Sequence, residues 1–244
     1  MPTHEKFVIF DGIDGSGKTT LAEAFVQTLA SRGKTIFHLA QTCKTSGEIP
    51  LPWPPSNEII FSSEPTRAWI GAAIRNELIR NGTDYRGSDV AAAFALDRLI
   101  LYTRFLIPML ERGAIVVQDR GVSSSIAYQP IMEKAVTLDE LLAFPGNALA
   151  LEHAPKHMVI ARCSAKTAIA RISARSDKKD DAIFEREDFL TRLAERYGSE
   201  WFKKLWEDRG TTVHYIDAEQ SLEAVKAEAA RLANEIFPNV IPSP

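Results

Sequence analysis

The sequence is poor in cysteine and contains no long hydrophobic run. Its 244 residues include two cysteines, Cys43 and Cys163, too few for a disulfide framework or a four-cysteine zinc site. The longest apolar runs, such as 90–96, fall far short of the roughly 18 residues of a membrane span. The N-terminus leads into only a brief apolar stretch, which is not typical of a secretory signal. We therefore expect a protein of the reducing cytoplasm that does not enter a membrane.

The sequence also lacks an excess of positive charge. Lysine and arginine together number 29, aspartate and glutamate 32, and the net charge is −3. A basic surface for nucleic acid is therefore excluded as a property of the whole protein. Hydrophobic residues make up 45% of the chain and charged residues 25%, which is ordinary for a globular protein and argues against disorder.

Short apolar segments alternate with amphipathic segments along the chain. Strand-like segments are 7–10, 35–39, 58–61, 114–117, 157–161 and 212–216. Helical periodicity covers 18–31, 69–80, 88–111, 124–134, 138–144, 166–175, 186–206 and 219–237. Pro145-Gly146-Asn147 is expected to break the chain. This alternation predicts βαβ units. We expect one α/β domain over residues 1–244, with a five-stranded parallel sheet flanked by helices and functional loops at the carboxyl ends of its strands.

Residues 41–57 interrupt this pattern. They contain four prolines around Trp53, and such a density of proline argues against a helix or a central strand. We predict a proline-rich inserted loop. It could be a surface insertion, a lid over a binding site or an interface.

The strongest motif is Gly12-Ile13-Asp14-Gly15-Ser16-Gly17-Lys18-Thr19, which fits G-x-x-x-x-G-K-[ST] between a predicted strand and a predicted helix. Its glycines let several backbone N–H groups point at one anion, and the helix N-terminus adds partial positive charge. Lys18 would reach the β- and γ-phosphates of ATP, and the Thr19 hydroxyl would bind Mg²⁺. The motif predicts a three-layer P-loop NTPase-type fold. The expected ATP phosphate-binding residues are Gly12, Asp14, Gly15, Ser16, Gly17, Lys18, Thr19 and Thr20.

An acid and a base, Asp119 and Arg120, follow the strand 114–117. An aspartate in this place can hold a metal ion, usually through water, and Arg120 would then face the phosphates. Alone, the pair also fits a surface ion pair. It is followed by polar side chains suited to a nucleobase and a sugar, namely Ser123, Ser124, Ser125, Tyr128 and Gln129.

Phe94, Asp97 and Arg98 are spaced i, i+3 and i+4, and so share one face of a predicted helix. An aromatic ring one turn from a guanidinium fits a nucleoside monophosphate, with the ring on the base and the guanidinium on the phosphate. Alone, the pattern also fits a core phenylalanine beside a surface ion pair.

Charge is unevenly distributed around residues 162–181. Residues 162–179 hold six basic side chains and one acid, whereas 180–188 hold five acids and one arginine. The run could be a solvated helix and turn. We interpret it as a basic helix and lid, because Arg171 and Arg175 lie one turn apart and could both face a transferring phosphoryl group.

Together these motifs resemble the thymidylate kinase family of nucleoside monophosphate kinases. The resemblance is carried by the P-loop, the Phe94–Arg98 stretch, Asp119-Arg120 with 124–129, Glu64-Pro65 with Ile74-Arg75, and 216–218. It spans most of the chain except 41–57 and 130–153. It implies ATP- and Mg²⁺-dependent phosphorylation of dTMP to dTDP by direct in-line transfer, with nucleotides as the binding partners.

The resemblance also implies roles for individual residues. Phe94 would stack on thymine, Arg98 would hold the acceptor phosphate, and Arg120 would bridge the acceptor and donor phosphates. Ser125 would address the base edge, Tyr128 the sugar and Asp14 the 3′-hydroxyl. The expected acceptor-binding residues are Asp14, Glu64, Phe94, Asp97, Arg98, Arg120, Ser124, Ser125, Tyr128 and Gln129. The expected catalytic residues are Lys18, Arg120, Arg171 and Arg175, and the metal ligands are Thr19 and Asp119.

Some family members keep a catalytic basic residue in the P-loop and others place it in the lid. This chain has Gly15 at the loop position, so Arg171 and Arg175 would supply the charge. Arg175→Ala is then expected to lower kcat on the order of 10²–10⁴-fold. The family usually dimerises through the helix that carries Phe94, and alanines at 91, 92, 93 and 95 would allow close helix approach. We therefore expect a homodimer.

Several positions depart from the family pattern on the acceptor side. Gly121 replaces an aromatic residue or histidine, Ser63 replaces an arginine, and Thr66 and Arg67 replace two glycines. Two alternatives therefore remain open. The chain could be a kinase for another deoxynucleotide or a deoxynucleoside, or a P-loop nucleotide-binding partner protein without kinase activity.

Overall fold

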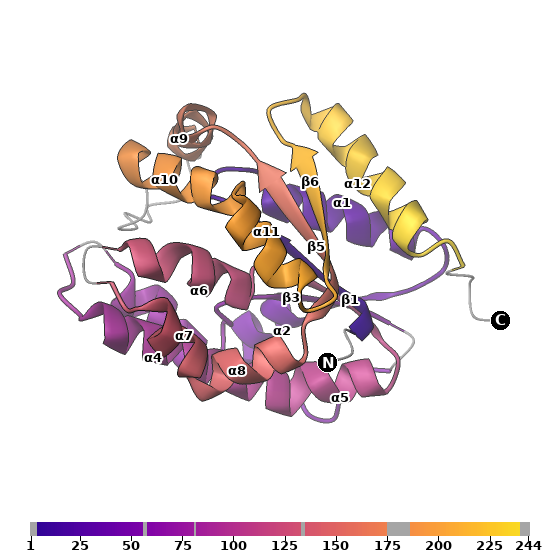
Figure 1. Ribbon diagram of the computed structural model, residues 1–244. Helices are drawn as coiled ribbons and strands as arrows, with labels where there is room; N and C mark the ends of the chain where they lie inside the picture. Colours follow the sequence, from indigo (N-terminus) through magenta and orange to yellow (C-terminus); the bar gives the residue numbers. More distant parts are fainter. Residues whose placement is uncertain (1–3, 56–57, 81, 133–134, 175–185, 240–244) are drawn as a thin grey trace.

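A computed structural model describes residues 4–55, 58–80, 82–132, 135–174 and 186–239 (Figure 1). Its centre is a six-stranded sheet of order β2-β3-β4-β1-β5-β6, in which every pairing is parallel. The strands are β1 (His4–Asp11), β2 (Ile36–His38), β3 (Ile59–Ser63), β4 (Ile115–Asp119), β5 (Pro155–Arg162) and β6 (Thr212–Asp217). The α/β fold is confirmed, but the expected five strands are wrong. All six apolar segments pair, including the three-residue edge strand β2.

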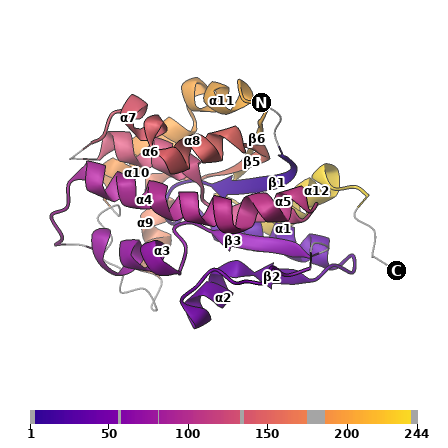
Figure 2. The same cartoon turned by 90° about the horizontal axis from the view of Figure 1, so that it is seen from below.

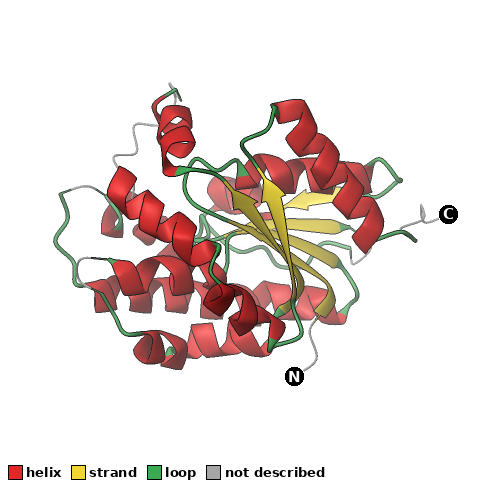
Figure 3. Ribbon diagram, turned by 45° about the horizontal axis from the view of Figure 1, so that its top comes forward, coloured by secondary structure: helices red, strands yellow, loops and turns green. Residues whose placement is uncertain are grey.

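Helices cover both faces of the sheet, which gives three layers (Figures 1 and 3). One face carries α1 (Lys18–Ala30) and α12 (Leu222–Ile236). The other carries α4 (Gly87–Leu101), α5 (Ile107–Glu111), α6 (Val122–Tyr128), α8 (Pro145–Glu152), α10 (Glu187–Tyr197) and α11 (Glu200–Glu207). Successive β1 residues alternate between the two cores, since Val8 and Phe10 pack under α1 while Phe7 and Ile9 pack on the opposite side. Of the helices in the described ranges, none combines the length and apolar character that crossing a bilayer requires.

The helix expected over 88–111 runs through a π-helical turn (Tyr102–Leu106) between α4 and α5. Pro108 lies in the first turn of α5 and has no N–H to donate to the carbonyl of Arg104, four residues earlier. The Trp53 indole N–H donates to that carbonyl instead, at 3.0 Å. The proline-rich segment therefore supports the long helix at the point where its own hydrogen bonding is interrupted.

Two expectations about irregular segments are wrong. Residues 41–46, placed at the start of the inserted loop, belong to α2 (Leu39–Ser46), which ends before the first of the four prolines (Figure 2). Pro145, expected to break the chain, begins α8, where its missing N–H is harmless. Before it lies α7 (Leu138–Ala143), which starts with a capping box between Thr137 and Glu140.

The remaining elements follow the predicted pattern with adjusted bounds. The segment 69–80 contains α3 (Trp69–Ala73) and a π-helical turn (Ile74–Leu78), and a 3₁₀ turn (Gln129–Ile131) extends α6. The basic helix is α9 (Ala165–Ser173). The helix expected over 186–206 is two helices, α10 and α11, because the Ser199 side chain caps a new N-terminus.

Candidate active site

The loop between β1 and α1 crosses the carboxyl edge of the sheet in the conformation that its glycines allow. Gly15 has a φ of 78°, and a Cβ on it would lie 2.4 Å from the Ala168 carbonyl oxygen in α9. No side chain fits between the loop and α9. The position at which some relatives carry a basic residue is therefore sterically closed here, which is consistent with charge supplied from α9 and the segment that follows it.

Lys18 is buried at the start of α1. Its Nζ donates to the Ile13 carbonyl at 3.1 Å and lies 3.8 Å from Asp14 Oδ1. Burial and then the neighbouring Arg120 lower the pKa of Lys18 to about 8. A bound phosphate would compensate this buried positive charge, so the lysine environment is that of an anion site.

Thr19 and Asp119, the expected metal ligands, are in contact. The Thr19 hydroxyl donates to Asp119 Oδ2 at 2.6 Å, whereas the buried Asp119 Oδ1 has no hydrogen-bond partner among the described residues. A free carboxylate oxygen beside a hydroxyl is the oxygen donor set that Mg²⁺ prefers. Nowhere in the described ranges do three His, Cys, Asp or Glu side chains gather as a metal cage. The pair therefore fits a Mg²⁺ ion that takes its other ligands from water and phosphate.

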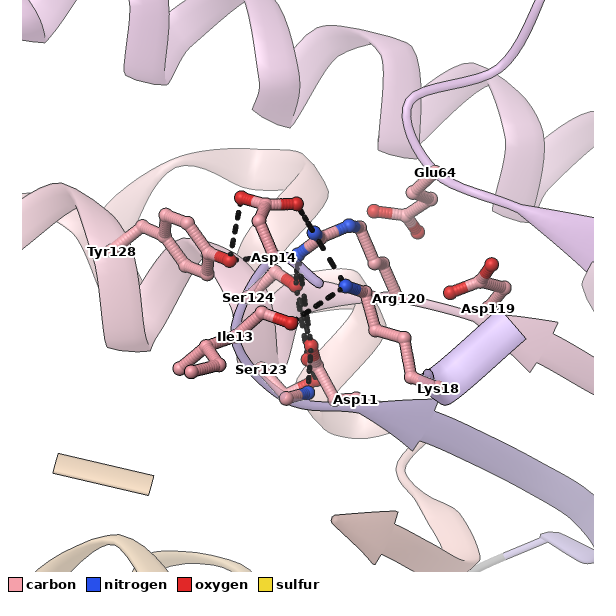
Figure 4. Close-up of polar contacts among 12 residues, drawn as sticks. Asp11, Ile13, Asp14, Lys18, Glu64, Asp119, Arg120, Ser123, Ser124 and Tyr128 are labelled. Atoms are coloured by element: carbon pink, nitrogen blue, oxygen red, sulfur yellow. Dashed lines mark hydrogen bonds and ion pairs between the residues drawn. The ribbon is translucent and has the colours of Figure 1, made fainter. Parts of the chain in front are cut away.

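Arg120 connects the P-loop to α6 (Figure 4). Its guanidinium forms an ion pair with Asp14 and donates to Ser124 Oγ at 3.1 Å and to the Tyr128 hydroxyl at 3.3 Å. Tyr128 in turn donates to Asp14 Oδ2 at 3.0 Å. Negative neighbours, Asp14 first among them, outweigh burial and raise the pKa of Arg120 further. Four of the residues expected around the acceptor are thus brought together.

Arg75 and Arg67 add positive charge near Arg120 and the loop after β3. Arg75 Nε donates to the Pro65 carbonyl at 3.0 Å, so the side chain lies against the loop after β3. Burial, then repulsion from Arg67 and Arg120, lower the pKa of Arg75 to about 10. Arg75 was not among the expected site residues, although Ile74-Arg75 is part of the family resemblance. In the structure, the proximity of Arg75 to Arg120 identifies it as a residue of the candidate site.

Arg98 lies in a buried polar network. The guanidinium is 1% exposed and pairs with Glu64 Oε2 at 2.6 Å. It also donates to the Asn147 side chain and, at 3.1 Å, to Ser125 Oγ. Burial raises the pKa of Glu64, and Arg98 opposes that shift. The structure thus joins Arg98 to Glu64 and Ser125, two other expected acceptor residues, and its binding to the acceptor phosphate stays a prediction.

Asn147 was not foreseen from the sequence. It is fully buried on α8, donates to the Leu141 carbonyl at 2.7 Å and accepts from Arg98. It lies in the stretch 130–153, which the resemblance does not cover. Its contact with a residue 49 positions away depends on how α8 packs on α4, and no local pattern signals it.

Asp97 holds the loop between β3 and α3. Its carboxylate accepts from the Thr66 backbone N–H at 2.7 Å and from the Thr66 hydroxyl at 2.6 Å. A Cβ at Gly71 would lie 2.3 Å from Thr66 Oγ1, so α3 approaches this loop closely. The threonine that replaces a family glycine therefore helps to hold the loop between β3 and α3.

The other expected acceptor residues lie on α4 and after α6. Phe94 is half-buried on α4, one turn before Arg98, and Gln129 is buried at the end of α6. The Gln129 Oε1 atom has no hydrogen-bond partner in the described part of the chain. In the P-loop, Ser16 Oγ is likewise buried and unpaired within that part, and Thr20 is half-buried in α1.

Of the two expected lid arginines, the structure describes Arg171. It donates to the Ser16 carbonyl at 3.3 Å and to the Ala218 carbonyl at 2.8 Å, and so lies across the P-loop toward the end of β6. Arg175 lies outside the described residues, as does the part of the lid at 175–181.

The chain was compared with known proteins. A family model described as "Thymidylate kinase" matches residues 55–229. The thymidylate kinase of Lactobacillus delbrueckii subsp. bulgaricus is 27% identical over 237 residues, which cover 96% of this chain and 98% of that protein. A probable thymidylate kinase of Caldivirga maquilingensis is 29% identical over 163 residues, 65% of this chain and 67% of that protein. The thymidylate kinase of Bifidobacterium longum is 33% identical over 128 residues, half of each chain. The family match begins after the P-loop, and the Lactobacillus protein extends the similarity across nearly the whole chain.

Proposed function

The chain belongs to the thymidylate kinase family, and from that premise we propose that it transfers the terminal phosphoryl group of ATP to dTMP, giving ADP and dTDP. The nucleoside monophosphate kinase class comes from the family. The use of ATP and Mg²⁺, in-line transfer, a single catalytic domain over residues 1–244 and a cytoplasmic location are parts of the proposal.

The single observation that carries the proposal is the convergence of buried positive charge at the carboxyl edge of the sheet. Lys18 and Arg75 both have lowered pKa values, and Arg120 contributes to each shift. Burial, the largest cause of both shifts, and the neighbouring cations disfavour these charges, and bound anions would offset that cost. A donor polyphosphate and an acceptor phosphate would provide those anions.

The proposed transfer needs charge neutralisation and alignment more than covalent catalysis. An ionised acceptor phosphate is already a nucleophile, so no general base is required. Lys18, Arg120 and Arg171 would neutralise charge on the transferring group, and Arg175 would add to it. Thr19 and Asp119 would hold Mg²⁺, which when bound would neutralise phosphate charge and orient the polyphosphate.

Acceptor selection would rest on the residues around Arg120 and Arg98. Phe94 would stack on the base, while Asp14 and Tyr128, which already form a hydrogen bond, would contact the sugar. Arg98, held in place by the buried Glu64 carboxylate, would present fixed donors toward the base or the phosphate. Ser63 stands where the family pattern has an arginine. Arg67 would replace that positive charge, and its proximity to Arg75 supports this role.

The test is a coupled ADP-release assay over a panel of nucleosides and nucleoside monophosphates. We expect dTMP to give the highest kcat/KM, and Lys18→Met, which removes the phosphate-binding cation, to abolish turnover. A different best acceptor would replace the dTMP assignment with the alternative that Gly121 and Ser63 motivate, another deoxynucleotide or a deoxynucleoside. ATP binding without phosphorylation of any acceptor would indicate a non-catalytic nucleotide-binding protein.

We also propose a homodimer formed through α4. Of its four alanines, Ala91 and Ala95 are buried, and Ala95 lies against Gly146 of the chain's own α8, so these two do not serve a partner. The outward face instead carries Leu96, which is 44% exposed, with the half-buried Leu99 and Ile100 beside it. Size-exclusion chromatography with light scattering tests this.

Leu96→Glu should shift the protein to the monomer, because a charge on this apolar face opposes burial. Leu222→Glu is the matched control, since Leu222 is 52% exposed on α12 in the opposite layer. A wild-type protein that is monomeric at all concentrations would contradict the proposal.

A further inference from the structure

Asp11 is the last residue of β1, directly before the P-loop, and its side chain is fully buried. The carboxylate accepts from the Gly12 backbone N–H at 2.8 Å and from the hydroxyls of Ser123 and Ser124 in α6. The Tyr197 hydroxyl donates to Asp11 Oδ1 at 2.8 Å. Hydrogen bonds to an ionised acceptor are among the stronger ones in proteins, and here they converge from three separate elements.

Tyr197 is the last residue of α10, the helix that follows residues 175–185 and packs against both α6 and α9 (Figure 1). Its side chain is 2% exposed, and its ring forms an edge contact with Tyr128 at 6.4 Å between centroids. The only polar atom of this side chain is therefore directed at Asp11, 186 positions earlier in the chain.

The same carboxylate leads to Arg120. Ser124 Oγ donates to Asp11 Oδ1 at 2.8 Å and accepts from Arg120 Nη1 at 3.1 Å, and Arg120 Nη1 lies 3.9 Å from Asp11 Oδ1 (Figure 4). One path of hydrogen bonds thus runs from Tyr197 through Asp11 and Ser124 to the guanidinium that pairs with Asp14. Since a buried network of this kind is satisfied as a unit, removing one donor changes the position of the others.

We propose that Tyr197 is a positioning residue for phosphoryl transfer. Through Asp11 and Ser124 it fixes the Arg120 guanidinium between the P-loop and α6, and it makes that position depend on the packing of α10. This inference rests on the proposed kinase activity. It adds a residue with no part in binding either nucleotide.

The experiment is a double-mutant cycle on kcat with Tyr197→Phe and Arg120→Lys. Tyr197→Phe keeps the ring packing and removes one hydroxyl, so it should lower kcat about 10- to 100-fold, the equivalent of one hydrogen bond to a charged group. The KM for ATP should stay within about twofold, since Lys18 forms none of these hydrogen bonds and the Gly12 N–H keeps its bond to Asp11. In the Arg120→Lys background the same change should have little further effect, because the group that Tyr197 positions is already altered.

The matched control is Tyr215→Phe. The Tyr215 hydroxyl donates to the Tyr197 backbone carbonyl at 3.3 Å, so it supports α10 without contacting Asp11. It should leave kcat unchanged. Equal losses of kcat in Tyr197→Phe and Tyr215→Phe would indicate general support of α10 and overturn the inference, as would additive effects in the cycle. A wild-type protein that phosphorylates no acceptor would overturn the proposed function and this inference with it, so the two failures are distinguishable.

Discussion

At the scale of single residues, the site contains ionisable side chains whose pKa values are shifted by burial and by neighbouring charges. The sequence predicted Lys18, Thr19, Asp119 and Arg120, because each lies in a short motif that ends or follows a strand. It did not predict Arg75, Asn147 or Tyr197. Their contacts arise when distant segments pack, and the residue types are common elsewhere in the chain. The network around Asp11 therefore follows from tertiary structure and not from spacing.

The lowered pKa of Lys18 predicts proton uptake when ATP binds. The native pKa of about 8 lies below the ordinary 10.5, so above pH 8 the empty site has lost a proton that the unfolded chain still carries. Burial of the charged lysine therefore destabilises the native state below pH 8, and this penalty is relieved as the pH rises toward 10.5. Bound phosphates raise the pKa again. Calorimetry in buffers of different ionisation enthalpy should detect uptake of roughly half a proton at pH 8.

Lys18→Arg serves as the control for this uptake, because an arginine stays charged at pH 8. The variant should bind ATP without taking up the proton. Uptake of the same size in Lys18→Arg would assign the proton to another group.

Gly71 is the residue on which the close approach of α3 to the loop between β3 and α3, the proposed acceptor loop, depends. An alanine Cβ would meet Thr66 atoms at 2.3–2.6 Å, two of them in the backbone, so the loop must move. Gly71→Ala should raise the KM for dTMP at least about tenfold, since displacement of a substrate-positioning loop by about 1 Å is costly. The KM for ATP should not change.

Gly198→Ala is the comparison for this substitution, because the added methyl would meet its nearest neighbour at 3.4 Å. It should leave both KM values unchanged. A rise in the KM for ATP in Gly71→Ala would show that the effect is not confined to the acceptor loop.

At the scale of secondary structure, the alternation of strands and helices was predictable and the helix ends were less so. The strand before the P-loop was identified as a continuous apolar segment, and the helix after it by its periodicity. Pro145 was misread because proline both ends helices and begins them, and the sequence alone does not separate the two. The six strands were visible as segments, but pairing of the short edge strand β2 depends on β3 lying beside it.

The Trp53 indole predicts that the proline-rich segment stabilises the long helix. Trp53→Phe keeps an aromatic ring but leaves the Arg104 carbonyl without its indole donor, which should lower the free energy of unfolding by about 1–3 kcal/mol. Urea unfolding measures this. Trp201→Phe is the control, because Trp201 is 41% exposed and should matter less. A normal stability with a raised KM for dTMP would instead favour the acceptor-lid alternative for residues 41–57.

At the scale of the whole molecule, histidines that pair across the sheet link stability to pH. His153 and His157, which are four residues apart, do not face each other. His153 stacks on His4, and His157 Nδ1 lies 3.0 Å from His214 Nε2. Burial first, then His214, lower the pKa of His157 to about 4, and burial lowers the pKa of His214. Their pairing joins β5 to β6.

These shifts predict loss of stability in acid. Below the ordinary pKa of 6.5 the histidines of the unfolded chain become protonated, whereas His157 and His214 in the folded protein stay neutral. The free energy of unfolding therefore falls as the pH drops from about 6.5 toward 4. His157→Gln should flatten this part of the curve, measured as the urea midpoint at pH 7 and pH 5. His38→Gln, an exposed site on β2, is the control. An unchanged slope in His157→Gln would assign acid sensitivity elsewhere.

The backbone of Arg120 has a φ of 67°, a left-handed conformation that glycine adopts freely and other residues do not. The backbone conformation taken by itself would favour glycine at this position, so the arginine is retained against the conformational preference of its own backbone. Comparing Arg120→Gly with Arg120→Ala isolates this preference, since both lack the side chain. The glycine variant should unfold at a free energy about 1 kcal/mol higher, while both should lose activity. Equal stability would mean that the backbone relaxes once the guanidinium is gone. A difference in stability would mean that the protein gives up some stability in order to place the Arg120 guanidinium. A more stable variant at this position would then be an inactive one.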